Sequence, residues 1–88
     1  MTLERISEII NERIDTKDNN RIIFTYYQLR VKENLSENDL RDFIYYGKIR
    51  LEKLGYKVYL PGQRYTWDYA NRFVQDNELL LAIKFSTS

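Results

Sequence analysis

The chain has 88 residues, which is enough for one domain, and we expect residues 1–88 to fold as a single unit. It contains no cysteine and no histidine, which excludes disulfide scaffolds, Cys/His zinc sites, and catalysis by a thiol or an imidazole. The net charge is +1, and no apolar run approaches the roughly 18 residues of a membrane span. We therefore expect a soluble cytoplasmic protein with no cofactor, no membrane contact and no small-molecule ligand.

The positive charge is concentrated in the middle of the chain. Residues 1–20 carry three basic and five acidic side chains, whereas residues 41–72 carry seven basic and three acidic ones. Such an asymmetry is a weak indication of an anionic partner. A solvated charged surface explains the same counts equally well.

The first part of the chain predicts a helix, a loop and a short strand. Thr2 is placed to cap a helix over residues 3–14. Its apolar residues recur at three- and four-residue steps, with Ile9 widening the stripe: Leu3, Ile6, Ile10 and Ile14. Residues 15–20 have the composition of a loop, and residues 21–24 have that of one brief strand.

A second helix is predicted over residues 25–33. Thr25 and Gln28 have the spacing of a capping box, in which the two side chains satisfy each other's backbone amides. Asn34 follows the helix, and asparagine tolerates the left-handed backbone conformation that helix ends use.

A third helix over residues 37–54 shows the clearest pattern in the sequence. Ser36 caps it with Asp39 three residues on, and Gly55 ends it. At about 100° per residue its apolar positions form one narrow stripe: Leu40, Phe43, Ile44, Gly47, Leu51 and Leu54. Gly47 weakens the helix, so its place on the stripe indicates a close crossing with another element.

The last part of the chain predicts strands over residues 56–60 and 79–85, with residues 61–78 between them. Three aromatic residues alternate in that segment, which favours extended structure: Tyr65, Trp67 and Tyr69. We slightly prefer a hairpin arm that turns at Asp76–Asn77. A short helix capped by Asp68 is the alternative.

The order of elements is helix, short strand, helix, tight turn, long helix, strand, loop and strand. Four motifs accompany this order: Thr25-Tyr26-Tyr27-Gln28-Leu29-Arg30, Asn34-Leu35-Ser36, Leu40-Arg41-Asp42-Phe43-Ile44 and Leu51-Glu52-Lys53-Leu54-Gly55-Tyr56. From Ile22 to Phe85 the chain resembles the winged helix-turn-helix family of DNA-binding domains. It departs from the family in having Asn34 where glycine is frequent, and in a long segment 61–78.

The resemblance implies an α+β fold with three helices, a short β-sheet and a long wing. It also implies sequence-specific binding of double-stranded DNA, with residues 37–54 in the major groove and the wing near the backbone or the minor groove. One small module covers a short half-site, so we expect a homodimer, formed through residues 3–14 or residues 65–69. A transcriptional regulator is the default role. A plasmid or phage accessory factor, such as one for origin recognition in conjugation or partition, is equally compatible.

The helical wheel selects four candidate DNA contacts on one stripe away from the apolar face. Arg41 can donate twice to guanine, and Asn38 can pair with adenine. Tyr45 and Lys48 are candidates for phosphate contacts. Glu52 lies on the same stripe and argues mildly against deep insertion of the C-terminal end of the helix, and an ordinary solvated face is an equal alternative.

Further candidate contacts lie outside this helix. The backbone amides of Thr25 and Tyr26 are placed to meet a phosphate, with help from the hydroxyl of Tyr26 or Tyr27, and we expect one of these tyrosines in the core. Arg64 and Arg72 flank the alternating aromatic residues and can approach phosphates from the wing. We favour three interpretations of those aromatic residues in this order: a place in the core, a dimer contact, and stacking on bases.

A protein-binding winged helix, acting as an adaptor or an inhibitor without direct DNA contact, is the alternative function. Near-neutral net charge and many aromatic residues favour it, because aromatic residues and arginine are typical interface anchors. Enzymatic activity is not expected, since no nucleophile with its base and no glycine-rich phosphate loop is visible. Three acids of the first helix share one row, which a solvated face explains: Glu4, Glu8 and Glu12.

Overall fold

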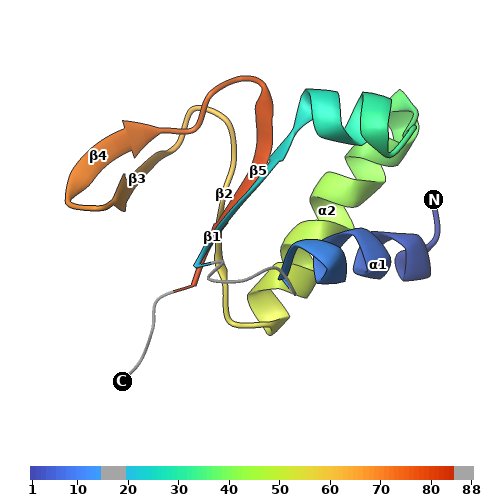
Figure 1. Cartoon of the computed structure of the whole chain (residues 1–88), viewed down its shortest axis with the longest axis horizontal. Coiled ribbons are helices and arrows are strands. Elements are labelled where there is room, and N and C mark those ends of the chain that lie inside the picture. Colours follow the sequence, from blue (N-terminus) through green and yellow to red (C-terminus); the bar gives the residue numbers. More distant parts are fainter. Residues whose placement is uncertain (15–19, 85–88) are drawn as a thin grey trace.

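A three-stranded antiparallel sheet lies between helices on one face and a β-hairpin on the other (Figure 1). The computed structural model describes residues 1–14 and 20–84. Its elements in chain order are α1 (Leu3–Ile14), β1 (Arg21–Thr25), η1 (Gln28–Lys32), α2 (Glu37–Lys53), β2 (Lys57–Tyr59), β3 (Arg64–Trp67), β4 (Ala70–Phe73) and β5 (Glu78–Ile83). The molecule is thus of the α+β class, as predicted.

The last strand, β5, is the centre of the sheet, whose order is β1-β5-β2. Both neighbours pair with it in the antiparallel sense, so that Ala82 lies between Ile22 and Val58. Successive side chains of a strand point to opposite faces. Leu80 and Ala82 pack against the helices, whereas Leu81 and Ile83 pack against the hairpin. Burial on both faces explains why β5 is a continuous apolar run instead of an alternating one.

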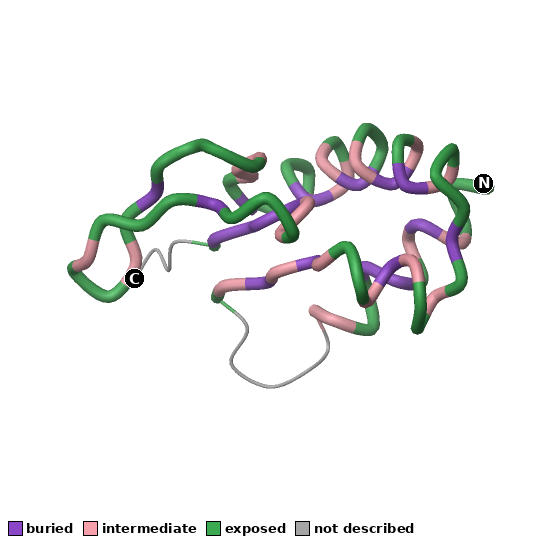
Figure 2. The backbone as a smooth tube through the Cα atoms, turned by 90° about the horizontal axis from the view of Figure 1, so that it is seen from above, coloured by how far each residue is buried: buried purple, intermediate pink, exposed green. Residues whose placement is uncertain are grey.

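The larger core lies between the sheet and the helices, and Figure 2 shows exposed residues along the outer turns of the helices and buried ones along the inner turns. The rings of Phe24 and Phe43 meet edge to face with centroids 5.1 Å apart. A Cβ added at Gly47 would lie 3.4 Å from Leu80 Cδ1 and 3.6 Å from Ile10 Cδ1. The close crossing predicted at this glycine is therefore confirmed.

The apolar stripe predicted for the first helix is wrong at one position. The side chains of Ile6, Ile9 and Ile10 are buried, but Leu3 is 62% exposed. Leu3 instead lines a groove between α1 and α2, together with Tyr46 and Ile49. The first turn of α1 therefore presents an apolar side chain to solvent.

The second predicted helix is confirmed in place but differs in its hydrogen bonding. Thr25 is the last residue of β1, and its hydroxyl accepts the amide of Gln28 at 3.2 Å. The segment η1 is a π-helix, in which the Glu33 amide donates to the Gln28 carbonyl at 3.0 Å. Asn34 then adopts the predicted left-handed conformation, with φ of 56°.

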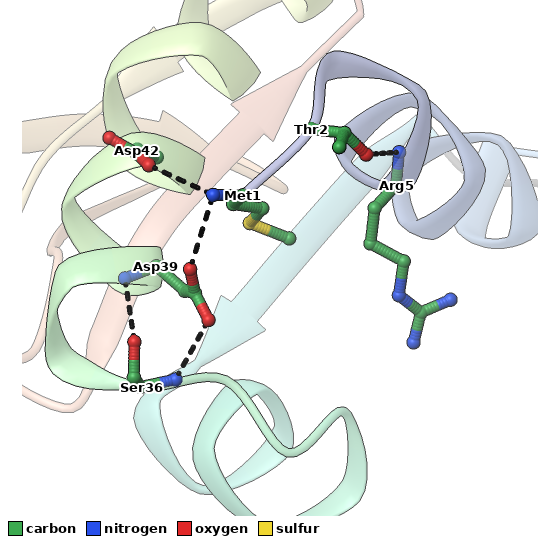
Figure 3. Close-up of polar contacts among 6 residues, drawn as sticks. All are labelled: Met1, Thr2, Arg5, Ser36, Asp39 and Asp42. Carbon is green, nitrogen blue, oxygen red and sulfur yellow. Dashed lines mark hydrogen bonds and ion pairs between the residues drawn. The ribbon is translucent and has the colours of Figure 1, made fainter.

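The N-terminus of α2 carries the predicted capping box. The Asp39 amide donates to Ser36 Oγ at 3.1 Å, and the Ser36 amide donates to Asp39 Oδ2 at 3.2 Å. Figure 3 shows that the amino group of Met1 also reaches this turn, 3.4 Å from Asp39 Oδ1 and 3.5 Å from Asp42 Oδ2. At the other end Gly55 follows the helix with φ of 94°, as predicted.

Replacing Ser36 by alanine is expected to lower the free energy of unfolding by about 1 kcal/mol, because the Asp39 amide then loses its acceptor. Urea unfolding at neutral pH measures this change. The substitution Ser7→Ala, on a serine within α1 that has no capping role, is the matched control and should be nearly neutral. An equal loss in both variants would contradict the role of the cap.

The same turn makes stability depend on pH. The hydrogen bond from the Ser36 amide holds the pKa of Asp39 below its ordinary value, so the carboxylate stabilises the folded state above that value. This contribution is lost as the pH falls through the lower pKa of the folded state. The free energy of unfolding, measured by urea unfolding at several pH values, should therefore fall less on acidification in Asp39→Asn than in the unsubstituted protein.

The segment between β2 and β5 forms the preferred hairpin, but the predicted position of its turn is wrong. Strands β3 and β4 pair directly, and the chain reverses at Asp68 and Tyr69, both with positive φ (53° and 63°). Two consecutive positive φ angles are typical of a type I′ turn, which asparagine and glycine normally announce. Tyrosine gives no such signal. Residues 76–77 form a separate turn that leads into β5, and no helix begins at Asp68.

The hairpin packs over the sheet through a second, smaller core. Tyr65 and Val74 are buried against Leu81 and Ile83, with Trp67 partly buried beside them. A place in the core is therefore confirmed for Tyr65 and in part for Trp67. The side chain of Tyr69 is fully exposed at the tip of the hairpin, so the core prediction is wrong for it.

Candidate nucleic-acid interface

A groove of about 480 Å³ runs along the outer side of α2, beside the end of β2. Three of the four predicted contacts on this helix line it, namely Arg41, Tyr45 and Lys48. The fourth, Asn38, is exposed one turn nearer the N-terminus of the same helix. The groove lies where the flank of α2, with Ile44 at the edge of its apolar stripe, meets Leu60 after β2.

The charges of the groove are available for a ligand. Among the described residues neither Arg41 nor Lys48 forms an ion pair. Glu52 is the acidic residue of the lining, one turn beyond Lys48. The charged lining residues are thus two cations, Arg41 and Lys48, and one carboxylate at the C-terminal end of the groove.

Apolar side chains occupy much of the groove, and the sequence analysis missed two of them. Ile49 is 39% exposed, and Leu60 contributes from the segment that follows β2. Tyr45 is 63% exposed and meets Tyr46 edge to face, with ring centroids 4.9 Å apart. The helical wheel places Ile49 opposite the apolar stripe, so the sequence could have indicated this exposed isoleucine.

The predicted contacts at Thr25 and Tyr26 are arranged differently from expectation. The Tyr26 amide donates to the Asn77 carbonyl at 2.7 Å, so this amide is already paired within the chain. The side-chain hydroxyl of Tyr26 donates to Glu37 Oε1 at 2.8 Å. Tyr26 and Tyr27 are both exposed and Leu29 is buried in their place, so the prediction that one of these tyrosines lies in the core is wrong.

Arg64 and Arg72 lie on the hairpin, which the sheet separates from α2 (Figure 1). Arg64 pairs across the hairpin with Phe73, and Arg72 pairs with Tyr65. Since these are successive pairs, the two arginines point to opposite faces of the hairpin. The guanidinium of Arg64 lies 5.4 Å from the centroid of the Phe73 ring. The structure therefore does not bring these two arginines together with Arg41 and Lys48.

Within residues 1–14 and 20–84, no helix has the length and apolar character to cross a membrane. The same residues contain no group of three or more histidine, cysteine, aspartate or glutamate side chains arranged to hold a metal ion. No protein-family model matches the chain, and comparisons with curated proteins and with solved structures give no match either.

Proposed function

We propose that this chain is a winged helix-turn-helix protein that binds double-stranded DNA at a specific sequence, with α2 in the major groove. The observation that carries the proposal is the outward face of α2, a capped helix of 17 residues with two unpaired cations, Arg41 and Lys48. The order of elements and the strand order β1-β5-β2 support it. An α-helix with such a face fits the width of the major groove of B-DNA.

Each residue of this face has a distinct task in the proposal. Arg41 donates two hydrogen bonds to a guanine, and Asn38 pairs with an adenine. Tyr45 and Lys48 contact phosphates and set the register of the helix on the duplex. The segment after β2 borders the groove through Leu60 and contributes the contact of the wing in this proposal.

The proposed active form is a homodimer that regulates transcription or serves a plasmid or phage as an accessory factor. One recognition helix reads only a few base pairs, and two copies on adjacent half-sites supply the remaining affinity and specificity.

Alanine at Arg41 should weaken binding to the preferred site by about 1–3 kcal/mol and relax specificity at one base pair. Alanine at Lys48 should weaken binding to all sequences alike, because a phosphate contact carries no sequence information. The site is first selected from a random pool of duplexes at a stated salt concentration, and both variants are then measured by mobility shift. Lys53→Ala is the matched control, since Lys53 is exposed on the same helix outside the groove.

Two results would contradict this proposal. One is the absence of any enriched sequence in the selected pool. The other is affinity that does not fall as salt rises, because contacts to phosphates release counterions and are therefore strongly salt-dependent.

A second candidate function is favoured by an exposed apolar band across α2 and the start of α1. The band consists of Leu3, Tyr45, Tyr46 and Ile49, all of them more than a third exposed. Ile49 lines both the groove along α2 and the groove between the helices. Contiguous exposed apolar side chains are typical of protein–protein interfaces. This band supports a winged-helix adaptor or inhibitor, whose binding would be largely insensitive to salt.

A further inference from the structure

A second, polar groove of about 450 Å³ lies between the outer face of β1 and the hairpin strand β4. It is on the side of the sheet opposite the larger core, so it is distinct from the groove along α2. Two arginines line it, Arg21 of β1 and Arg72 of β4. They come from segments far apart in the sequence, and only the fold of the hairpin over the sheet brings them together.

The strand registers direct both arginines toward this groove. Arg72 pairs with the buried Tyr65, so it lies on the face of the hairpin that is turned to the sheet. Arg21 lies on the same face of β1 as Ile23, which packs against the hairpin core. The guanidinium of Arg21 lies 5.0 Å from the centroid of the Trp67 ring. Stacking on the ring leaves the N–H edges of this guanidinium free for an acceptor.

No carboxylate within the described residues pairs with either arginine. Glu78 is the acidic residue of the lining, and its Oε1 accepts the Gln75 amide at 2.8 Å. The side-chain amide of Gln75 donates to the Phe73 carbonyl at 3.2 Å. The two guanidinium groups are thus the cationic donors of the groove, beside the neutral side chains of Tyr65 and Asn71.

We propose that Arg21 and Arg72 hold a phosphate group of a nucleic-acid strand in this groove. A guanidinium presents parallel N–H groups that match two phosphate oxygens, and two guanidiniums facing one groove can donate to the two non-bridging oxygens of a phosphodiester. The chain then carries a second nucleic-acid surface, which does not depend on α2 reading DNA.

Trp67 reports directly on this groove, because it is the single tryptophan of the chain and lies beneath Arg21. The full chain is titrated with a short single-stranded thymidine oligonucleotide and, separately, with pyrophosphate, while Trp67 emission is followed. We expect the oligonucleotide to change the emission and Arg72→Ala to weaken its binding about tenfold. The slope of affinity against salt should also fall by about 1 in that variant.

Arg64→Ala is the matched control, because it removes the same charge from the other face of the same hairpin. It should change oligonucleotide affinity less than about twofold. A fluorescence-anisotropy measurement with labelled oligonucleotide extends the test to Arg21→Lys, which keeps the charge but loses the paired donors and should also bind more weakly. Thermal unfolding verifies that every variant is folded.

Three outcomes would overturn the proposal. Equal losses in Arg64→Ala and Arg72→Ala would mean attraction to overall charge and not a groove. A Trp67 response to pyrophosphate without an Arg72-dependent response to the oligonucleotide would assign the groove to a free phosphate. If neither the oligonucleotide nor pyrophosphate binds, the groove is not a phosphate site. Lys48→Ala separates this groove from α2, since it should leave the Trp67 titration unchanged whether or not duplex recognition fails.

Discussion

Replacing Phe43 by alanine is expected to lower the free energy of unfolding by about 3–5 kcal/mol. The ring is fully buried at the centre of the larger core and meets the edge of Phe24 at 5.1 Å. Its removal loses apolar burial, the aromatic contact and the packing around Gly47, and leaves a cavity that a rigid helix and sheet cannot fill. A domain of 88 residues has a total stability of about 4–13 kcal/mol, so much of the margin is lost.

Urea unfolding followed by circular dichroism measures this loss. Tyr27→Ala is the control, because it truncates an aromatic side chain that is 62% exposed and should change stability by no more than about 0.5 kcal/mol. A loss below about 1 kcal/mol for Phe43→Ala would contradict the packing of α2 against the sheet through this ring.

Replacing Leu81 by alanine is expected to cost about 2–5 kcal/mol and to act on the other side of the sheet. Leu81 is fully buried in the smaller core, where it packs with Tyr65 and Val74 of the hairpin segment. Truncation of Leu81 weakens the packing of the hairpin on the sheet, while the contacts of Leu80 with the helices remain. The emission of Trp67 should therefore shift to the red, and the helical signal of the folded protein should remain.

The matched control for this substitution is Leu3→Ala, since Leu3 is exposed and its truncation should be nearly neutral. Fluorescence and circular dichroism recorded on the same sample distinguish the two cores. Unchanged Trp67 emission in a folded, destabilised Leu81→Ala protein would contradict the packing of the hairpin on β5.

Local sequence signals predicted most of the helical layer. The capping box of Ser36 and Asp39, the stop at Gly55 and the close approach at Gly47 all follow from residues within one helix, where spacing alone decides the geometry. The candidate face of α2 was predicted for the same reason. Once one stripe of a helix is committed to the core, the opposite stripe is exposed.

Two kinds of feature were not predicted: a turn without a residue signal, and contacts between segments remote in the sequence. The turn at Asp68 and Tyr69 uses left-handed backbone at a tyrosine, which no propensity announces, and it is fixed by the pairing of β3 with β4. The amide of Tyr26 is taken by the carbonyl of Asn77, a partner supplied by the loop before β5. The sequence places Arg21 in a short strand and gives no sign of the polar groove, because Arg72 lines the same groove but is remote in sequence.

The double burial of β5 has a consequence for the synthesis of the chain. Each core needs side chains of β5, and β5 follows all the other helices and strands in the sequence. Until it leaves the ribosome, the inner faces of both helices and of the hairpin lack their common partner. Folding must then wait for the long-range pairing of β1 with β5, which favours late, cooperative closure over stepwise growth. Until β5 has been synthesised the nascent chain thus exposes the apolar surface that β5 later covers, and chaperone binding protects it best during that time.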